Sequence, residues 1–221
     1  MVCLKNMREI NFVTGEFYHI FNRGVDKREI VSDLHDVNRF LQSMIEFNNV
    51  DGVGSIYENS FRQKNEIKKQ RNNLVDFVAY CINPNHYHFI LRQKTENGIS
   101  QFMKKLGGYS GYYNLRHKRS GSLFQGPFKA VHIDSNEYLL HLSVYVNLNF
   151  HKHKLGYRVA KFVKSSWGEY TNESIDGFCK KDIILKQFKN KKEYKDFSED
   201  IFESILEKSG EEKNLQDLLL E

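Results

Sequence analysis

The sequence predicts one α+β domain followed by a helical tail, and this prediction rests on two kinds of pattern. Four segments alternate like strands or are continuously apolar, and three segments space their apolar residues like helices. The strand-like segments are residues 16–23, 75–82, 86–92 and 128–133, and the helical ones are residues 36–49, 99–117 and 136–149. Their order is β-α-β-β-α-β-α, which is typical of a compact α+β fold.

The strands are predicted from alternation and from turn residues. Residues 16–23 are rich in aromatic side chains, alternate, and end at Gly24. Residues 75–82 and 86–92 are rich in β-branched and aromatic side chains, and the sequence Asn-Pro-Asn at 83–85 separates them. Asparagine and proline favour turns, so these two segments should form a hairpin.

The helices are predicted from apolar spacing and from signals at their ends. In residues 36–49 the apolar side chains recur every three or four positions. Residues 99–117 have a similar spacing but contain three glycines, which weaken the middle of this helix. The third helix should open with Asp134 as its N-cap and with Glu137 at the capping-box position.

The domain organisation follows from the distribution of these elements. Residues 1–165 should form the main domain, and residues 166–221 should form a C-terminal helical appendage. The polar segment 51–73 should be a long loop or an insertion. Within the appendage, helices are expected at residues 182–189, 192–208 and 212–220.

The composition excludes several classes of protein. The three cysteines are odd in number and far apart, which argues against a disulfide framework and for a reducing compartment. They form no cluster with histidine that is typical of structural zinc. There is no secretory signal and no apolar run of the ~18 residues that a membrane span needs. We therefore expect a cytoplasmic protein with no membrane partner.

The charge is unevenly distributed along the chain. The net charge is +5, with +9 in residues 1–170 and −4 in residues 171–221. No acidic residue lies between Glu96 and Asp134. This distribution suits a polyanionic partner such as a nucleic acid. A lysine-rich, solvated surface would explain the same charge without such a partner.

Two histidines on a predicted strand are candidate metal ligands. Side chains two residues apart on a strand point to the same face, so His86 and His88 should project together while Tyr87 and Phe89 point into a core. Two imidazoles on one face of a rigid hairpin are well placed to chelate a metal ion. Two surface histidines on an edge strand would show the same spacing.

The third predicted helix carries a candidate nucleophile. Tyr145 and Asn149 are four residues apart and therefore share a helix face. A phenol has a pKa near ~10, so an attack on phosphorus at neutral pH needs a divalent ion to stabilise the developing charge. The amide oxygen of Asn149 would be a third ligand beside the two imidazoles. Ordinary packing at the margin of the core explains a single tyrosine equally well.

Several segments taken together resemble the HUH single-tyrosine transposases of small insertion sequences, and in particular the REP-associated tyrosine transposases. The resemblance covers roughly residues 12–170. The segments that carry it are Phe-Tyr-His-Ile-Phe-Asn-Arg-Gly at 17–24, Asn-Pro-Asn-His-Tyr-His-Phe at 83–89, Gly-Ser-Leu-Phe-Gln-Gly at 121–126, and the segment from Glu137-Tyr138-Leu139 to Tyr145-Val146-Asn147-Leu148-Asn149.

The resemblance implies a fold, a reaction and roles for particular residues. It implies a ferredoxin-like or RRM-like antiparallel sheet with helices on one face, and residues 1–165 as the catalytic domain. His86 and His88 would bind Mg²⁺ or Mn²⁺ with Asn149 as the third ligand, and Tyr145 would form a 5′-phosphotyrosine intermediate. The substrate would be single-stranded DNA beside a DNA hairpin. Such enzymes often work as dimers, so a homodimer is also compatible with the resemblance.

The sequence departs from the family at three places. Phe150 stands where family members often have proline, and Pro127 stands where an arginine often follows Phe-Gln-Gly. The segment 51–73 is longer than the family leads us to expect. None of these differences falls on a predicted ligand or on the predicted nucleophile.

Basic and aromatic side chains are interleaved in the acid-free stretch, which is the composition of a single-strand binding surface. We expect four basic residues of this stretch to contact DNA phosphates: Arg116, Lys118, Arg119 and Lys129. Arg23, in the Asn-Arg-Gly turn at the end of the first strand, is a fifth candidate, although a turn that terminates the strand would explain this sequence equally well. Most of the aromatic residues would serve equally well in the core.

Two other functions remain compatible with the sequence. The chain would also suit a non-catalytic module that binds single-stranded nucleic acid on an RRM-like fold, and such binding would not depend on the histidines. A metal-dependent phosphodiesterase with water as the nucleophile would cleave DNA without a covalent adduct, but the further ligands of a two-metal site are not evident.

Overall fold

The computed structural model describes residues 10–52, 54, 72–152, 162–172 and 177–218, and for residues 209–218 it describes the backbone alone. The predicted insertion at 51–73 lies almost entirely outside the described residues.

A five-stranded sheet forms the centre of the molecule. Its strands are β1 (Phe17–Arg23), β2 (Val75–Ile82), β3 (His86–Gln93), β4 (Lys129–Ile133) and β5 (Lys164–Ser165). Their order across the sheet is β4-β1-β3-β2-β5, and every neighbouring pair is antiparallel. The first four strands follow the order of a ferredoxin-like sheet, and β5 adds an edge that was not predicted. The predicted α+β fold class is confirmed.

Eight helices are described besides the sheet, one of them a short 3-10 turn. They are the 3-10 turn (Val25–Lys27), α1 (Leu34–Phe47), α3 (Gly98–Leu106), α4 (Tyr109–Arg116), α5 (Asn136–Lys152), α7 (Trp167–Thr171), α8 (Asp182–Leu185) and α9 (Lys191–Leu218). Within the parts of the chain that the structure describes, no helix is long and apolar enough to cross a membrane.

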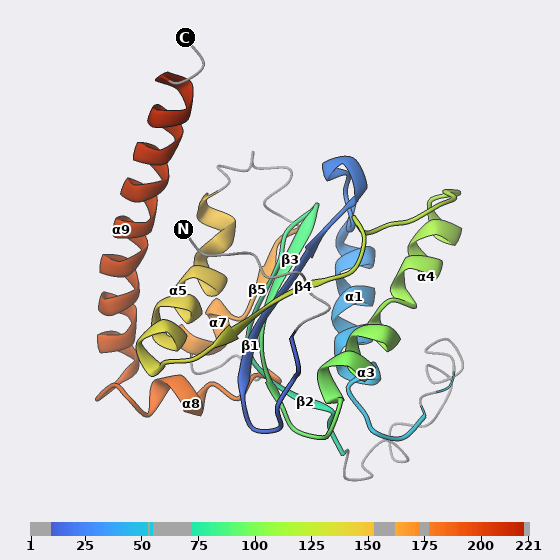
Figure 1. Ribbon diagram of the computed structural model, residues 1–221, viewed down its shortest axis with the longest axis horizontal. Helices are drawn as coiled ribbons and strands as arrows, with labels where there is room; N and C mark the ends of the chain where they lie inside the picture. Colours follow the sequence, from blue (N-terminus) through green and yellow to red (C-terminus); the bar gives the residue numbers. More distant parts are fainter. Residues whose placement is uncertain (1–9, 53, 55–71, 153–161, 173–176, 219–221) are drawn as a thin grey trace.

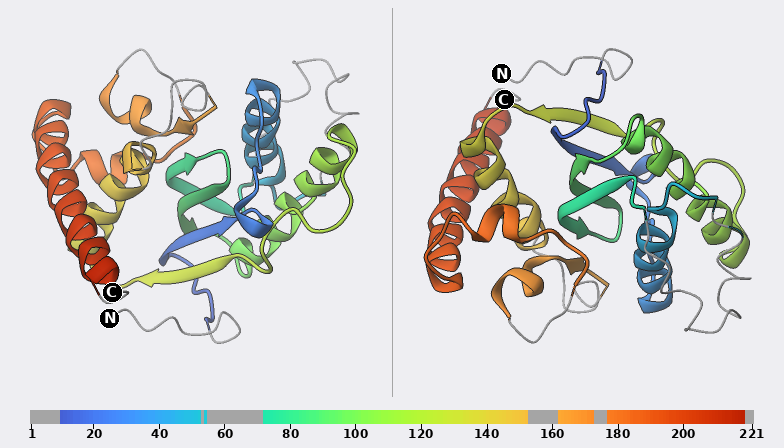
Figure 2. Two further views of the ribbon diagram at one scale, coloured as in Figure 1. Left: turned by 90° about the horizontal axis from the view of Figure 1, so that it is seen from above. Right: turned by 90° about the horizontal axis from the view of Figure 1, so that it is seen from below.

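Helices cover both faces of the sheet, whereas helices on one face alone were expected. Figure 1 shows α1, α3 and α4 on one side of the sheet and α5, α7 and α9 on the other, and the two views of Figure 2 agree. The helices of the β-α-β-β-α-β unit do lie on one face. All eight residues of β2 are buried, on both faces of the strand. A strand of this kind requires a covering layer on each face, which explains the helices on the second face.

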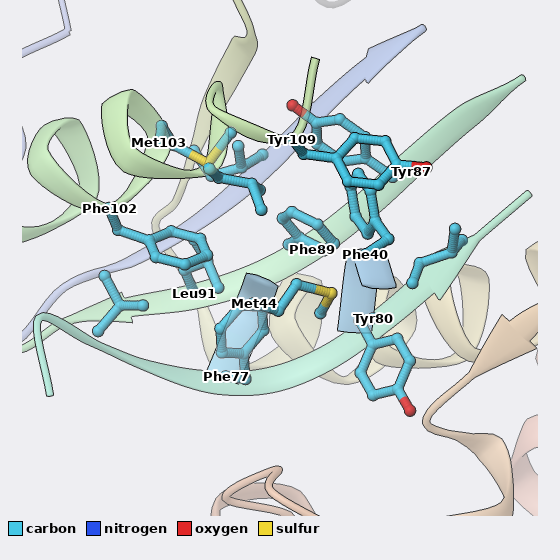
Figure 3. Packing of buried hydrophobic residues seen from close by; sticks show 14 of the residues in the cluster. Phe40, Met44, Phe77, Tyr80, Tyr87, Phe89, Leu91, Phe102, Met103 and Tyr109 are labelled. Atoms are coloured by element: carbon cyan, nitrogen blue, oxygen red, sulfur yellow. The ribbon is translucent and has the colours of Figure 1, made fainter. Parts of the chain in front are cut away.

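The two faces of the sheet have separate hydrophobic cores. In the first, Phe40 of α1 packs against Tyr87 and Phe89 of β3, and Phe102 of α3 packs against Phe77 of β2 (Figure 3). In the second, apolar residues of α5 pack against β2 and β3 together with two fully buried tyrosines of the tail. The residues of this second core include Val78, Ile90, Leu139, Leu142, Val146, Tyr170 and Tyr194. Part of the tail is thus built into the core, and the division at residue 165 stays a prediction.

Several predicted helix boundaries and caps differ from the structure, and the predicted helix 182–189 is observed only at Asp182–Leu185. The predicted helix 99–117 is two helices, because the chain tightens into 3-10-type bonds at Gly107 and Gly108. The side chain that caps α5 is Ser135 rather than Asp134, since its hydroxyl accepts the backbone N–H of Tyr138 at 3.2 Å. The helices expected at 192–208 and 212–220 are one helix, because a glycine inside a helix costs only about 1 kcal/mol.

The first core yields a stability prediction. Phe89 is fully buried on a strand that lies between two other strands. We expect Phe89→Ala to lower the free energy of unfolding by about 3–5 kcal/mol, because it removes a large side chain and leaves a cavity. Denaturant unfolding measures this change. The control is Leu115→Ala at a side chain that is 83% exposed, which should change stability by less than about 0.5 kcal/mol. Equal losses in the two variants would contradict the assignment of the core.

Candidate active site

The two predicted histidine ligands lie on the sheet face that α5 covers. His86 opposes Arg23 and His88 opposes Phe21 in the β1–β3 ladder. Directly opposed residues of antiparallel strands share a face, so these four side chains lie on one side. The ring centroids of His86 and His88 are 5.2 Å apart. The intervening Tyr87 points into the opposite core, as the alternation predicts.

Hydrogen bonds define the protonation of His86. Its Nδ1 lies 2.7 Å from the amide oxygen of Asn85, which can only accept, so Nδ1 carries a proton. In the neutral ring the lone pair is then on Nε2. This atom lies 3.0 Å from the amide nitrogen of Asn83, a donor, and 3.1 Å from the amide oxygen of Asn149, an acceptor. Two acceptors therefore face each other between β3 and α5.

A third histidine that sequence reasoning missed contacts this site. His19 of β1 is buried, and its Nε2 lies 2.9 Å from Nδ1 of His88. Burial lowers the pKa of His19 to about 4, so the ring is neutral at physiological pH. Alternation along β1 could have placed His19, Phe21 and Arg23 on one face. It could not have shown that this face is the histidine face, because that depends on the register between β1 and β3.

The helix α5 brings Tyr145 and Asn149 to the histidines. The ring centroid of Tyr145 lies 5.5 Å from that of His88 and 6.3 Å from that of His19, each in an edge-on arrangement. Burial raises the pKa of the Tyr145 hydroxyl above its usual value near 10, and a hydrogen bond with Asn149 offsets part of this rise. The phenol is therefore protonated at neutral pH and lies beside two imidazoles and an amide.

A buried polar network fixes α5 against the sheet. The amide oxygen of Asn147 accepts the hydroxyl of Ser166 at 2.5 Å, and the amide nitrogen donates to the hydroxyl of Tyr194 at 3.1 Å. Ser166 in turn accepts the backbone N–H of Tyr80 on β2 at 2.9 Å. Asn147 lies between Tyr145 and Asn149 in the chain. This network therefore sets the rotation of α5 about its axis and its position along that axis, and with them the placement of both residues.

The site residues fit a divalent cation. Nε2 of His86 and the amide oxygen of Asn149 are two acceptors 3.1 Å apart, and the amide nitrogen of Asn83 donates to both, at 3.0 and 2.9 Å, so a divalent cation would take the place of this shared donor. Imidazole nitrogen and amide oxygen together suit an ion such as Mn²⁺. Among the residues described, no group of three or more His, Cys, Asp or Glu side chains could hold a metal ion. A set of three ligands here therefore requires the amide oxygen.

The five predicted DNA contacts divide into two groups. Arg23 and Lys129 are exposed and lie on the histidine face, because Lys129 opposes Phe21 in the β1–β4 ladder. The other three, Arg116, Lys118 and Arg119, lie at and just after the end of α4, on the side of the sheet away from α5 (Figure 1).

Arg116 has a structural partner of opposite charge. Its guanidinium contacts Asp33 and the fully buried Asp36 at the start of α1, each at 2.6 Å. These ion pairs join α4 to α1 and compete with any phosphate for the same nitrogens. Arg119 lies over the ring of Tyr113, with 5.6 Å between its guanidinium carbon and the ring centroid. Its charge is therefore also directed partly toward the protein.

The residues on either side of Arg23 have structural roles. The amide oxygen of Asn22 accepts the backbone N–H of Arg23 at 2.8 Å, and its amide nitrogen donates to the carbonyl of Gly126 at 3.1 Å. A Cβ at Gly24 would lie 2.0 Å from the carbonyl oxygen of Arg28, so only glycine fits there. These contacts explain two of the three residues in this turn and leave the Arg23 side chain at the surface.

Comparison with known proteins identifies the relationship. Residues 56–149, which contain the β2–β3 hairpin, both histidines, Tyr145 and Asn149, match the family described as "Transposase IS200 like". Over these residues, which are less than half of the chain, the protein is similar to the IS200-like transposases. The resemblance to the HUH single-tyrosine transposases is thereby confirmed. No curated protein matches the chain significantly.

A solved structure has a similar fold. It is described as a REP-associated tyrosine transposase bound to a REP hairpin. The TM-score is 0.51 at 11% sequence identity, and the match covers 79% of this chain and 90% of the other. At this identity the likeness concerns the fold.

The polar network around Asn147 yields a second prediction. Tyr194→Phe removes the hydroxyl that binds Asn147 and Ser143 and leaves a buried amide nitrogen without its partner. We expect the free energy of unfolding to fall by about 1–3 kcal/mol, measured by denaturant titration.

The matched control is Tyr112→Phe. The buried hydroxyl of Tyr112 has no hydrogen-bond partner in the described structure, so its removal should cost nothing. If both variants lose the same stability, the Tyr194 hydroxyl does not support α5.

Proposed function

We propose that this protein cleaves and rejoins single-stranded DNA, with Tyr145 as the nucleophile. The observation that carries the proposal is the meeting of β3 and α5, where the Tyr145 ring lies 5.5 Å from that of His88 and Asn149 lies 3.1 Å from Nε2 of His86. The relation to IS200-like transposases supports the same class of reaction. All four residues come from one chain, so the proposed site does not require a partner subunit.

The proposed reaction has two balanced transfers. First, the Tyr145 oxygen attacks the phosphorus of a DNA phosphodiester, a bond to phosphorus forms, and the bond to the 3′-oxygen breaks. The phenolic proton passes to solvent, the 3′-oxygen takes up a proton, and a 5′-phosphotyrosine results. Second, the 3′-hydroxyl of another strand attacks this phosphorus and Tyr145 leaves. Bond energy is conserved in the covalent intermediate, so the joining step needs no ATP.

His86, His88 and Asn149 are the residues that would hold the divalent ion, Mg²⁺ or Mn²⁺. Such an ion polarises a phosphate oxygen and stabilises the charge that develops there. In the neutral ring, the bond from Nδ1 of His86 to Asn85 places the lone pair on Nε2. It also holds Asn149 one helical turn from the nucleophile, so ligand and attacking oxygen share one rigid element.

We propose that Arg23 and Lys129 contact the DNA phosphates next to the cleaved bond, because both are exposed on the histidine face. Arg116, Lys118 and Arg119 would contact DNA only at a distance from the site, and Arg116 would first have to leave its aspartates. The solved structure of the same fold is bound to a REP hairpin. We propose a DNA hairpin with a single-stranded flank as the ligand of this chain as well.

The decisive experiment detects the covalent intermediate. Labelled hairpin DNA with single-stranded flanks is incubated with protein and Mn²⁺ and analysed on a denaturing gel. We expect wild type to form a protein–DNA adduct and Tyr145→Phe to form none, because the phenol oxygen is the attacking atom.

The control variant is Tyr138→Phe, on the same helix but two turns before Tyr145, which should retain the adduct. An undiminished adduct in Tyr145→Phe would contradict the proposal. Metal-dependent cleavage with no adduct would indicate water as the nucleophile. Binding that ignores chelators, without cleavage, would favour the non-catalytic module.

The raised pKa of Tyr145 predicts a pH dependence. The phenolate is the attacking form, and its fraction grows as the pH rises toward a pKa above 10. The initial rate of adduct formation should therefore increase about tenfold per pH unit between about pH 7.5 and 9. The rate is measured at saturating DNA with Mg²⁺. A plateau below pH 8 would mean that the phenol ionises far more easily than its burial implies.

A further inference from the structure

We propose that His19 is a positioning residue for His88: its Nε2 accepts the Nδ1–H of His88 and so leaves the lone pair of His88 Nε2 available to a metal ion. This inference rests on the proposed function, because it takes His88 to be a ligand. It concerns a residue of the first strand to which the sequence analysis assigned no role and which lies outside the residues that match the family.

The contact between the two rings is close, buried and held from several sides. The nitrogens are 2.9 Å apart, and the rings are inclined by 22°. Both side chains are more than nine-tenths buried. The ring of His19 stacks on Phe21 at 4.8 Å between centroids, and Tyr145 meets it edge-on. The β1–β3 ladder fixes the backbones on which both rings stand.

A single proton lies between these two nitrogens, and its position decides what His88 can do. If His19 donates, a neutral His88 carries its own proton on Nε2 and has no lone pair there for a metal. If His88 donates from Nδ1, its Nε2 is unprotonated and can coordinate an ion. Only the second arrangement is compatible with His88 as an Nε2 ligand.

His86 shows the same arrangement with a different partner. Its Nδ1 donates to the amide oxygen of Asn85 at 2.7 Å, which leaves Nε2 unprotonated. The two candidate ligands on β3 would then share one tautomer, set by Asn85 in the turn before β3 and by His19 on β1. Metal-binding histidines commonly donate their second ring N–H to a fixed acceptor in this way, and loss of that acceptor weakens metal affinity about 10–100-fold.

His19 acts through His88 in this proposal rather than on the reacting atoms. Its Nε2 is already engaged with His88, so the same atom cannot also ligate the ion. Its ring centroid lies 6.3 Å from that of Tyr145, farther than that of His88. The test must therefore report on the state of His88 and not on cleavage alone.

The experiment compares His19→Phe with His19→Gln. Phenylalanine fills the space and has no acceptor, whereas the glutamine side-chain oxygen can replace Nε2. Ring-nitrogen NMR of histidine-labelled, metal-free protein identifies the tautomer of His88. We expect the Nδ1–H form in wild type and in His19→Gln, and the Nε2–H form to become populated in His19→Phe.

Mn²⁺ affinity is measured on the same proteins by electron paramagnetic resonance, with His88→Ala as the reference for a lost ligand. We expect about 10–100-fold weaker binding in His19→Phe and a change of only a few-fold in His19→Gln. A merely structural role for His19 would lower the melting temperature without this dependence on an acceptor.

The outcomes separate this proposal from the proposed function. The proposal for His19 is overturned if His88 in wild type has the Nε2–H tautomer. It is also overturned if His19→Phe keeps the wild-type tautomer of His88 and the wild-type Mn²⁺ affinity. If wild type and His88→Ala bind Mn²⁺ equally weakly, the metal ligands of the proposed function are wrong, and the NMR result alone decides whether His19 sets the tautomer. Should His19→Phe fail to fold, wild type and His19→Gln still give the tautomer.

Discussion

The docking of α5 onto the sheet is the contact on which the site depends. The histidines stand on a strand with neighbours on both sides, and they would face solvent without this helix. Leu142 and Val146 supply the apolar contact, while Asn147 fixes the orientation through Ser166 and Tyr194. Apolar contact alone tolerates sliding and rotation, whereas hydrogen bonds of defined direction do not. Buried polar groups must find their partners, so one setting of the helix is strongly favoured.

The sequence predicted the elements that repeat a simple period, and it missed the contacts that join distant elements. Alternation predicted the hairpin and the shared face of His86 and His88, and helical spacing predicted the shared face of Tyr145 and Asn149. Neither pattern carries information about register or about which face meets which. His19 was missed for this reason, because its contact with His88 spans 69 residues and depends on the pairing of β1 with β3.

Charge was a less reliable guide than periodicity. Four of the five basic residues that were predicted to contact DNA were chosen because they lie in a sequence stretch without acidic residues, but an acidic residue that is distant in the sequence can be close in the structure. Asp33 and Asp36 lie about eighty residues before Arg116 and contact it directly. A buried carboxylate such as Asp36 requires a partner, so this arginine stabilises the contact between α1 and α4.

The predicted N-cap of α5 was wrong by only one residue, because Asp134 and Ser135 are both good capping residues.

The partners of Asn147 lie later in the chain than the helix they hold, and this order matters during synthesis. The strands with the three histidines and the helix with Tyr145 are complete before Ser166 has been added, and Tyr194 follows 28 residues after that. Until then the polar side chain in the middle of α5 lacks the groups that orient it. A ribosome-bound or prematurely terminated chain would contain the strand with His86 and His88 before the groups that orient the helix of Tyr145 have been added. The strand-cleaving activity proposed for this chain would thus require synthesis to proceed past Tyr194.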